Sequence, residues 1–109
     1  MAWLVSEGRV LASLEVVDTA RGRMRGLVGR ECVEGALLLR PARGVHTFGV
    51  RFPIDVAFCG ADMRVIDIVT MQPSRLGRPR IGARVIIETA AGCLQRWGVA
   101  VGDQLEVRA

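Results

Sequence analysis

The chain has 109 residues, of which 50% are hydrophobic and 24% charged, and its formal net charge is +4. This size and composition predict one globular domain, residues 1–109, and exclude an intrinsically disordered chain. The longest apolar runs have four or five residues, which excludes a membrane-spanning helix of about 20 apolar residues. The first residues lack a basic segment followed by a long apolar one, so we expect no secretory signal and a cytoplasmic location.

All 15 basic residues are arginine, and the chain contains no Lys, Asn or Tyr. A basic chain invites a nucleic-acid partner. However, the three missing residue types need AT-rich codons, so a GC-rich genome explains part of the basicity. The chain also has only two Trp and three Phe, which supply a base-stacking surface poorly. Nucleic acid is therefore a less favoured partner class.

The chain opens with two alternating apolar segments, 3–5 and 10–16, around Gly8. This pattern predicts a β-hairpin, which we place at the edge of a sheet.

A short helix is predicted next. Asp18 and Thr19 are good N-cap residues, and the apolar positions that follow have helical spacing. We expect the helix to end near Gly29. Gly22 and Gly26 weaken it, but their spacing of four places both on one face, where the backbone can approach another element closely.

The middle of the chain reads as three strands. Residues 36–40 are a continuous apolar run, typical of a buried strand. After Pro53, residues 54–58 alternate between two faces, which predicts a strand with one buried face. Residues 63–70 follow as its hairpin partner, in which Asp67 must face solvent or find a partner.

The last third begins with a loop at residues 72–82, which contain two Pro, two Gly and three Arg. A strand at 85–89, one or two helical turns within 90–97 and a final strand at 105–107 follow. The chain is therefore mainly β, bordering on α+β. We expect a small strand-rich barrel or two packed sheets with one or two short helices.

The central stretch holds the only histidine and is the first place to look for a site. A groove where polar side chains converge would bind a small molecule or a protein partner, and its candidate residues are His46, Thr47, Arg51, Asp55 and Glu88.

An alternative makes His46 and Asp55 the acid and base groups of a small hydrolase, with Thr47, Ser74 or Cys59 as nucleophile. A purely structural interpretation has His46 hydrogen-bonded at a strand end and Asp55 accepting backbone N–H groups. The sequence leaves open whether the protein is an enzyme.

Arginines supply a second candidate site. Arg75, Arg78 and Arg80 of the basic loop could hold a phosphate or another anion. The alternative for these residues is a solvated loop in an arginine-biased chain. The same two interpretations apply to the arginines around the first helix, which are Arg21, Arg23, Arg25 and Arg30.

Metal and redox chemistry have little support. Cys32, Cys59 and Cys93 are far apart and form no C-x-x-C pair, so we expect free structural cysteines. One histidine with scattered carboxylates is no usual ligand set. We expect no metal and no cofactor.

Several short blocks together resemble one family, and they keep its order along the chain: Asp18–Ala20, Arg23–Leu27, His46–Phe48, Pro53–Phe58, Arg64–Ile66, Val85–Glu88 and Val101–Asp103. They resemble the bacterial and archaeal family called domain of unknown function 192, from about residue 19 to 107. The resemblance implies a compact strand-rich fold and no known activity. Many members carry a Trp-Met and Asn-Thr pattern where this chain has His46, Thr47, Gly49 and Val50, so a site built on that pattern is not carried over.

These observations favour a small, non-enzymatic module that binds a ligand or a protein partner. The alternatives are the hydrolase and an arginine-mediated binder of anions or nucleic acid. The ligand, the oligomeric state and the role of residues 72–82 are not determined by the sequence.

Overall fold

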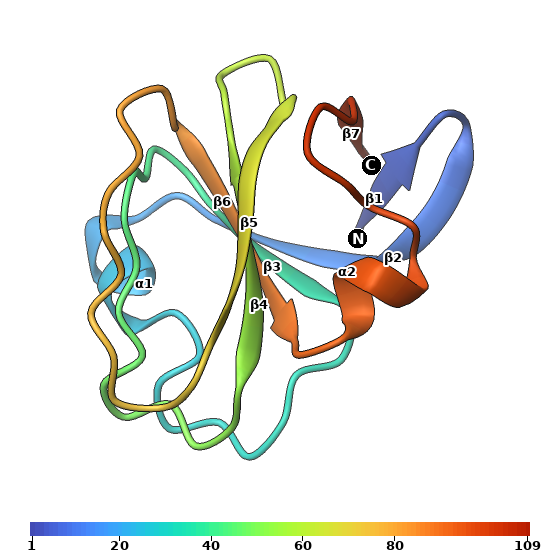
Figure 1. Cartoon of the computed structure of the whole chain (residues 1–109). Coiled ribbons are helices and arrows are strands. Elements are labelled where there is room, and N and C mark those ends of the chain that lie inside the picture. Colours follow the sequence, from blue (N-terminus) through green and yellow to red (C-terminus); the bar gives the residue numbers. More distant parts are fainter.

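The computed structural model describes all 109 residues and contains one seven-stranded mixed sheet that curls into a half-barrel (Figure 1). The strand order is β5-β4-β6-β3-β2-β1-β7. The strands are β1 (Ala2–Ser6), β2 (Arg9–Val17), β3 (Ala36–Leu39), β4 (Ile54–Cys59), β5 (Val65–Met71), β6 (Val85–Ala90) and β7 (Leu105–Arg108). The helices are α1 (Ala20–Arg25) and α2 (Cys93–Arg96). The predicted mainly β fold with one or two short helices is confirmed, and the sheet forms a half-barrel rather than two packed sheets.

All neighbouring strands are antiparallel except β2 and β3. Parallel neighbours need a crossover connection. Here α1 and the chain up to residue 35 provide it, and they lie over one face of the sheet (Figure 1).

The opening hairpin is present, but β1 is not an edge strand as expected. The last strand, β7, pairs with β1 along Trp3 to Ser6 and takes the edge position. The two true edges, β5 and β7, then meet at their ends. The Val65 N–H donates to Asp103 O at 2.9 Å, and the Leu105 N–H donates to Met63 O at 3.0 Å. This contact partly closes the curl.

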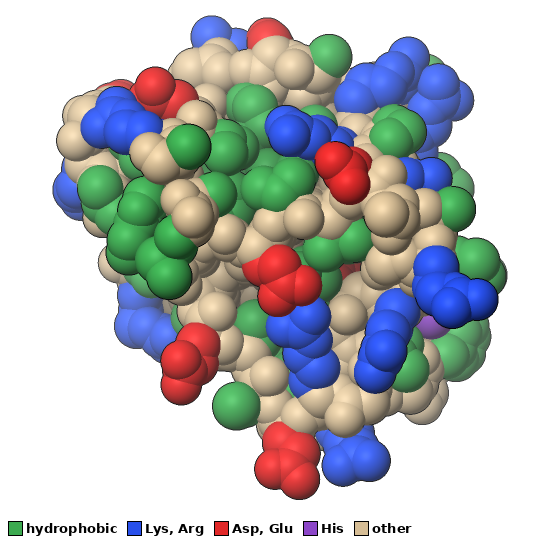
Figure 2. Space-filling view, turned by 180° about the vertical axis from the view of Figure 1, so that it is seen from behind, with side chains coloured by type: hydrophobic (Ala, Val, Ile, Leu, Met, Phe, Trp, Pro, Cys, Tyr) green, Lys and Arg blue, Asp and Glu red, His purple; other side chains and the backbone are tan.

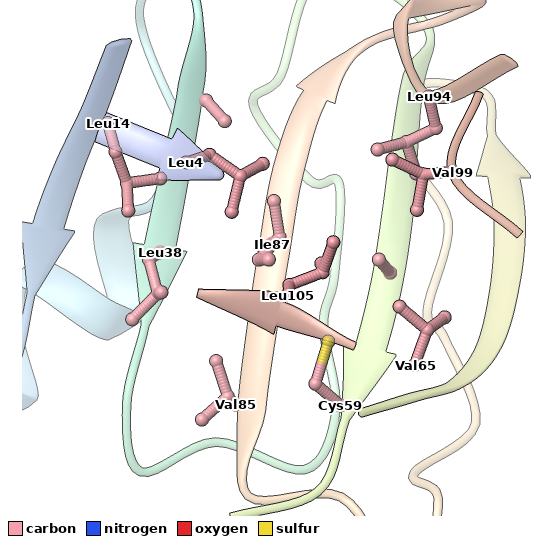
Figure 3. Packing of buried hydrophobic residues seen from close by; sticks show 12 residues of the cluster. Leu4, Leu14, Leu38, Cys59, Val65, Val85, Ile87, Leu94, Val99 and Leu105 are labelled. Atoms are coloured by element: carbon pink, nitrogen blue, oxygen red, sulfur yellow. The ribbon is translucent and has the colours of Figure 1, made fainter. Parts of the chain in front are cut away.

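A hydrophobic core lies on each face of the sheet. One contains Leu4, Leu38, Ile87 and Leu105 and is covered by β1, β7 and α2 (Figure 3). The other contains Phe58 and is covered by the chain around α1. All six residues of β4 are therefore buried, so the expectation of one buried face was wrong for this strand. The side chains of β4 do alternate between the two faces of the sheet, but each face packs against a hydrophobic core and neither is exposed to solvent.

Helix α1 begins as predicted, because the Thr19 hydroxyl accepts the Gly22 N–H at 3.1 Å. It ends at Arg25, earlier than expected, because Gly26 has φ 48° and ψ −121°, which is not helical. The predicted close approach occurs: a Cβ atom on Gly22 would lie 2.5 Å from Cγ1 of Val17.

The basic loop predicted at 72–82 is a loop, and it is held against residues 43–47. The Arg80 N–H donates to Arg43 O at 3.1 Å, and the Gly77 N–H donates to Val45 O at 2.8 Å. The Thr47 N–H donates to Arg75 O at 2.8 Å. These two segments run together beside α1 (Figure 1). Neither helix has the length and apolar character that crossing a membrane requires.

Candidate functional site

The strand register separates the candidate residues onto two faces of the sheet. Glu88 on β6 pairs with Val56 on β4 and with Leu37 on β3, and Leu37 pairs with Glu15 on β2. Paired residues share a face, so this row faces α1. Asp55 is the neighbour of Val56 in β4, and its side chain therefore points to the opposite face. Glu88 and Asp55 do not converge.

Asp55 holds α2 in place. Its Oδ1 accepts the Thr70 hydroxyl at 2.7 Å, and its Oδ2 accepts the N–H groups of Gly92 at 2.9 Å and Leu94 at 3.3 Å. The side chain is 4% exposed. A buried carboxylate with three donors has the partners that burial requires. This arrangement matches the structural interpretation, with the N–H groups supplied by the α2 turn.

Glu88 has the opposite environment. The residue is 3% exposed, and its Oε1 is the only enclosed side-chain oxygen or nitrogen in the protein without a hydrogen-bond partner. Burial raises the pKa of Glu88 to about 7, against the lowering effect of the positive charge on Arg30. A buried carboxyl without a partner favours its neutral form. Near neutral pH, Glu88 therefore exchanges between the acid and the carboxylate.

Gly26 makes room for this carboxyl group. A Cβ atom on Gly26 would lie 3.0 Å from Oε1 of Glu88, closer than ordinary van der Waals contact. The positive φ of 48° also requires glycine. The chain after α1 thus crosses directly over Glu88.

A polar cavity of about 310 Å³, large enough for a small molecule, lies beside this crossing. We call it the α1 cavity, and it is lined by Glu15, Val17, Gly22, Arg25, Gly26 and Arg30. Arg30 Nη2 contacts Oε2 of Glu15 at 3.0 Å. The side chain of Arg25 makes no hydrogen bond or ion pair within the protein. With Glu88 neutral, the cavity region has a surplus of one positive charge.

His46 lies on the other flank of α1. Its Nε2 is 3.2 Å from Met24 O, and its Nδ1 accepts the Phe48 N–H at 3.2 Å. Since a carbonyl only accepts, Nε2 carries the proton in this arrangement. The ring also stacks on Phe48, with centroids 5.6 Å apart. In Figure 2 the histidine lies at the margin of the face, next to basic side chains.

Thr47 and Arg51 do not join His46 in a groove with Glu88. Thr47 is fully buried, and its hydroxyl donates to Gln72 O at 2.7 Å and accepts the Arg75 N–H at 2.8 Å. It fastens the basic loop. Arg51 is exposed and makes no hydrogen bond or ion pair.

The arginines of the basic loop are brought together, with different roles. They line a groove of about 380 Å³ beside β5, which we call the β5 groove and which is bounded by residues 69–72, 75–78 and Arg80. Arg80 pairs with Asp67 at 2.8 Å and lies over the Phe58 ring at 4.2 Å. Arg78 is exposed and its side chain has no partner. The expectation that Asp67 faces solvent or has a partner is confirmed, and the partner is Arg80.

The cysteines are free, and they differ in exposure. Cys59 is buried, Cys93 is half-buried and Cys32 is exposed. Burial, together with the charge of Asp62, raises the pKa of Cys59 to about 12, so its thiol is protonated near neutral pH. No three His, Cys, Asp or Glu side chains lie close enough together to hold a metal ion.

Comparison with known proteins identifies the family. The family model DUF192, described as an uncharacterized ACR, matches residues 2–107. The chain belongs to this family. Among curated DUF192 relatives, a UPF0127 protein of Thermococcus sibiricus is 30% identical over 99 residues, which is 85% of this chain. One of Pyrococcus abyssi is 34% identical over 105 residues, which is 92% of this chain. The match covers 64% of the first relative's length and 86% of the second's.

Two solved structures share the fold of this DUF192 chain. A protein of unknown function from Novosphingobium aromaticivorans has a TM-score of 0.81 over 96% of this chain and 82% of its own. A protein described as a putative transcription regulator, from Sinorhizobium meliloti, has a TM-score of 0.82 over 97% and 91%. Both are 21% identical to this chain, so they show the fold alone.

The sequence pointed to part of the α1 cavity. Glu88, Arg25 and Arg30 were candidates, and the spacing of Gly22 and Gly26 predicted a close backbone approach. Glu15 was not singled out. The alternation of β2 places Glu15 on the same face as Val17, but only the register across β3 puts Glu15 in one cross-strand row with Glu88, with Leu37 between them.

Proposed function

We propose that this DUF192 protein is a non-enzymatic binding module that takes up a small anionic molecule in the α1 cavity. The observation that carries the proposal is Glu88, a buried carboxyl group with a partnerless Oε1 directly beneath a glycine of the cavity wall. Buried polar groups without partners are rare, and ligand sites account for some of them.

The charges around the cavity favour an anion. Arg30 is neutralised by Glu15, while Arg25 has no partner and supplies a free guanidinium group. A guanidinium group binds carboxylate and phosphate groups through two parallel hydrogen bonds. Arg30 also lines the α1 cavity, and its guanidinium group can contact a bound anion while it stays paired with Glu15.

Glu88 makes the binding dependent on protons. In its acid form Glu88 adds no charge beside the anion, whereas its carboxylate repels it. Since its pKa is about 7, the neutral form becomes dominant as the pH falls below that value. We therefore expect anion affinity to increase as the pH falls through 7.

The test is a thermal-shift titration on three variants with sulfate and with oxalate, two anions whose own charges stay constant near neutral pH. Arg25→Ala removes the free cation, and Arg21→Ala is its matched control, because Arg21 lies on the same helix, is exposed and does not line the cavity. Glu88→Gln keeps the shape of the side chain without its titration. A ligand at 100 times its dissociation constant stabilises by about 2.7 kcal/mol, which raises the melting temperature by several degrees.

We expect the shift in the wild type and in Arg21→Ala, its loss in Arg25→Ala, and a shift that no longer depends on pH in Glu88→Gln. Equal shifts in Arg21→Ala and Arg25→Ala would contradict the proposal, since binding would then be general screening of surface arginines. Absence of any shift with either anion would contradict it as well.

The hydrolase alternative receives no support from the contacts of its two residues. Asp55 uses both oxygens to hold Thr70 and α2, and His46 uses both ring nitrogens on backbone groups beside α1. A catalytic pair needs a direct hydrogen bond between acid and base groups, or one through a water molecule.

A further inference from the structure

We propose that the β5 groove is a docking site for an acidic segment of a partner protein, which binds in extended conformation and adds a strand to the free edge of β5. This inference concerns a surface separate from the α1 cavity, and the two share no lining residue.

The edge of β5 is open along its second half. Strand β5 is terminal in the sheet and pairs only with β4. Its contact with the far edge involves Val65, at its beginning. The Ala91 N–H donates to Pro53 O, which orients the backbone groups of Ile54 toward β5 and away from β6. Alternation along the ladder then directs the backbone groups of Ile68 and Thr70 outward.

Only part of this edge is satisfied within the protein. The N–H of Ile68 donates to the side chain of Asp67 at 2.9 Å, so this position is blocked. No backbone hydrogen bond of a loop or turn involves Thr70, which is exposed. Its N–H and C=O groups, with the C=O of Ile68, are therefore available to one added strand.

The groove beside this edge is basic and has apolar parts. Arg75 and Arg78 are exposed and form no ion pair, whereas Arg80 is neutralised by Asp67. Its apolar lining comes from Val69, from the buried Met71 and from the largely exposed Leu76. An acidic strand with alternating apolar residues complements both features.

The groove wall is fixed before binding. Thr47 holds the backbone of Arg75 through its buried hydroxyl, and the Gly77 N–H bonds to Val45 O. A preformed wall avoids the cost of ordering a loop during association. The basic loop thus presents Arg75 and Arg78 at defined places along the strand edge.

A peptide fits these groups better than a nucleic acid does. The groove contains no aromatic side chain on which a base could stack. An open strand edge instead offers backbone hydrogen bonds, which are the main recognition element when an extended peptide is added to a sheet.

The experiment measures fluorescence anisotropy of a labelled peptide of alternating Val and Glu with the full chain. Two matched control peptides are used. One has Lys in place of Glu, and the other carries methyl groups on the backbone nitrogens that would face β5. A short single-stranded oligonucleotide tests whether the groove binds nucleic acid instead of an acidic peptide. The protein variants are Arg75→Ala with Arg78→Ala, and Arg21→Ala with Arg40→Ala as a control for exposed arginines elsewhere.

We expect the Val-Glu peptide to bind, and the Arg75 and Arg78 double variant to weaken binding about tenfold, with the control double variant unchanged. Backbone methylation should weaken it at least as much, and NMR should place the largest amide shift changes at Thr70. Equal binding of the methylated peptide, tighter binding of the oligonucleotide, or no binding would each overturn the proposal. We expect Arg25→Ala to leave peptide binding unchanged. A failure of the docking proposal is therefore distinguishable from a failure of the proposed anion binding in the α1 cavity.

Discussion

At the scale of single residues, the absence of a partner distinguishes Glu88 from other buried polar side chains. Thr47, Asp55 and Thr89 each make hydrogen bonds, to loop backbone, to α2 and to Gly35 O respectively. Glu88 has only the nearby charge of Arg30 to oppose the cost of its burial. A group in this position makes folding depend on pH.

Glu88 should lower stability as the pH rises. Its pKa is about 7 in the folded protein and 4.5 is the ordinary value. Between these values the unfolded chain releases the proton that the folded protein keeps, so the contribution of Glu88 is complete below pH 4.5 and lost as the pH rises to about 7. Relative to the wild type, Glu88→Gln should gain stability across this window, on the order of 3 kcal/mol. Urea unfolding at about pH 4 and about pH 8 measures it. Parallel pH profiles of the two proteins would contradict this account.

Gly26 should tolerate no side chain. In Gly26→Ala, the new Cβ meets Oε1 of Glu88 at 3.0 Å and the backbone keeps a positive φ, so we expect a loss of about 2–3 kcal/mol. Gly29→Ala is the matched control, because Gly29 has φ 79° but open space around its Cβ position. It should lose only about 1 kcal/mol. Thermal unfolding of both variants separates contact from backbone strain, and equal losses would show that the Glu88 contact contributes nothing.

At the scale of elements, β5 combines a blocked position and an open one on the same edge. Asp67 occupies the N–H of Ile68, and Arg80 holds Asp67 in that place while it covers Phe58. A charged residue on an edge strand protects it against unwanted pairing. The open position at Thr70 lies beside the basic groove, so any added strand meets Arg75 and Arg78.

Arg80 should stabilise β5 through both contacts. Its hydrogen bond to Asp67 holds the pKa of that carboxyl below its usual range. In Arg80→Ala we expect this pKa to rise toward the ordinary value of 3.8, as measured by NMR titration. Because the pKa of Asp67 is lower in the folded protein than in the unfolded chain, ionised Asp67 stabilises the fold at pH values above its unfolded pKa. This stabilisation is lost as the pH falls through the folded pKa. Arg80→Ala lacks it from the start, so the stability of the variant should fall less in acid than that of the wild type. Loss of the Phe58 contact should cost about 1–2 kcal/mol.

Arg84→Ala is a control for this prediction, since the Arg84 side chain bonds only to the backbone carbonyls of Ile81 and Ala83. An unchanged pKa of Asp67 in Arg80→Ala would contradict the role that we assign to the pair.

At the scale of the whole molecule, two cores share the central strands β3, β4 and β6. Each of these strands contributes alternate residues to both faces, so a defect in one core is transmitted through the sheet. The contact between β5 and β7 joins the first and last strands of the sheet order. The expected single domain therefore should unfold as one unit.

This cooperativity can be measured with one variant in each core. Phe58→Ala and Leu105→Ala remove fully or nearly fully buried side chains on opposite faces, and we expect losses of about 3–5 and 2–5 kcal/mol. Fluorescence of Trp97, which packs against the core that contains Leu105, reports that face, whereas circular dichroism reports the whole sheet. In Phe58→Ala both signals should shift together. A fluorescence transition that stays at the wild-type temperature would indicate two independent units.

Local chemistry made the elements predictable. The hairpin around Gly8, the helix start at Thr19, the apolar run of β3 and the alternation of β4 depend on neighbours in the sequence, so their signals survive without tertiary information. The edge position of the first hairpin was wrong because β7, about 100 residues later, pairs with β1. The single buried face of β4 was wrong because the second core comes from distant strands.

The sequence by itself determined the strand-rich fold, the family and the residue types available for a site. The alternation along 54–58 placed Asp55 and Val56 on opposite faces of the sheet. It did not predict that Glu88 lies on the same face as Val56. Only the tertiary structure decided that Asp55 is occupied by α2, that Glu88 lies without a partner under Gly26, and that Arg80 is neutralised while Arg78 is free. The physical reason is that burial and pairing of a charge depend on strand register and on elements far along the chain, whereas turns, caps and alternation depend on adjacent residues.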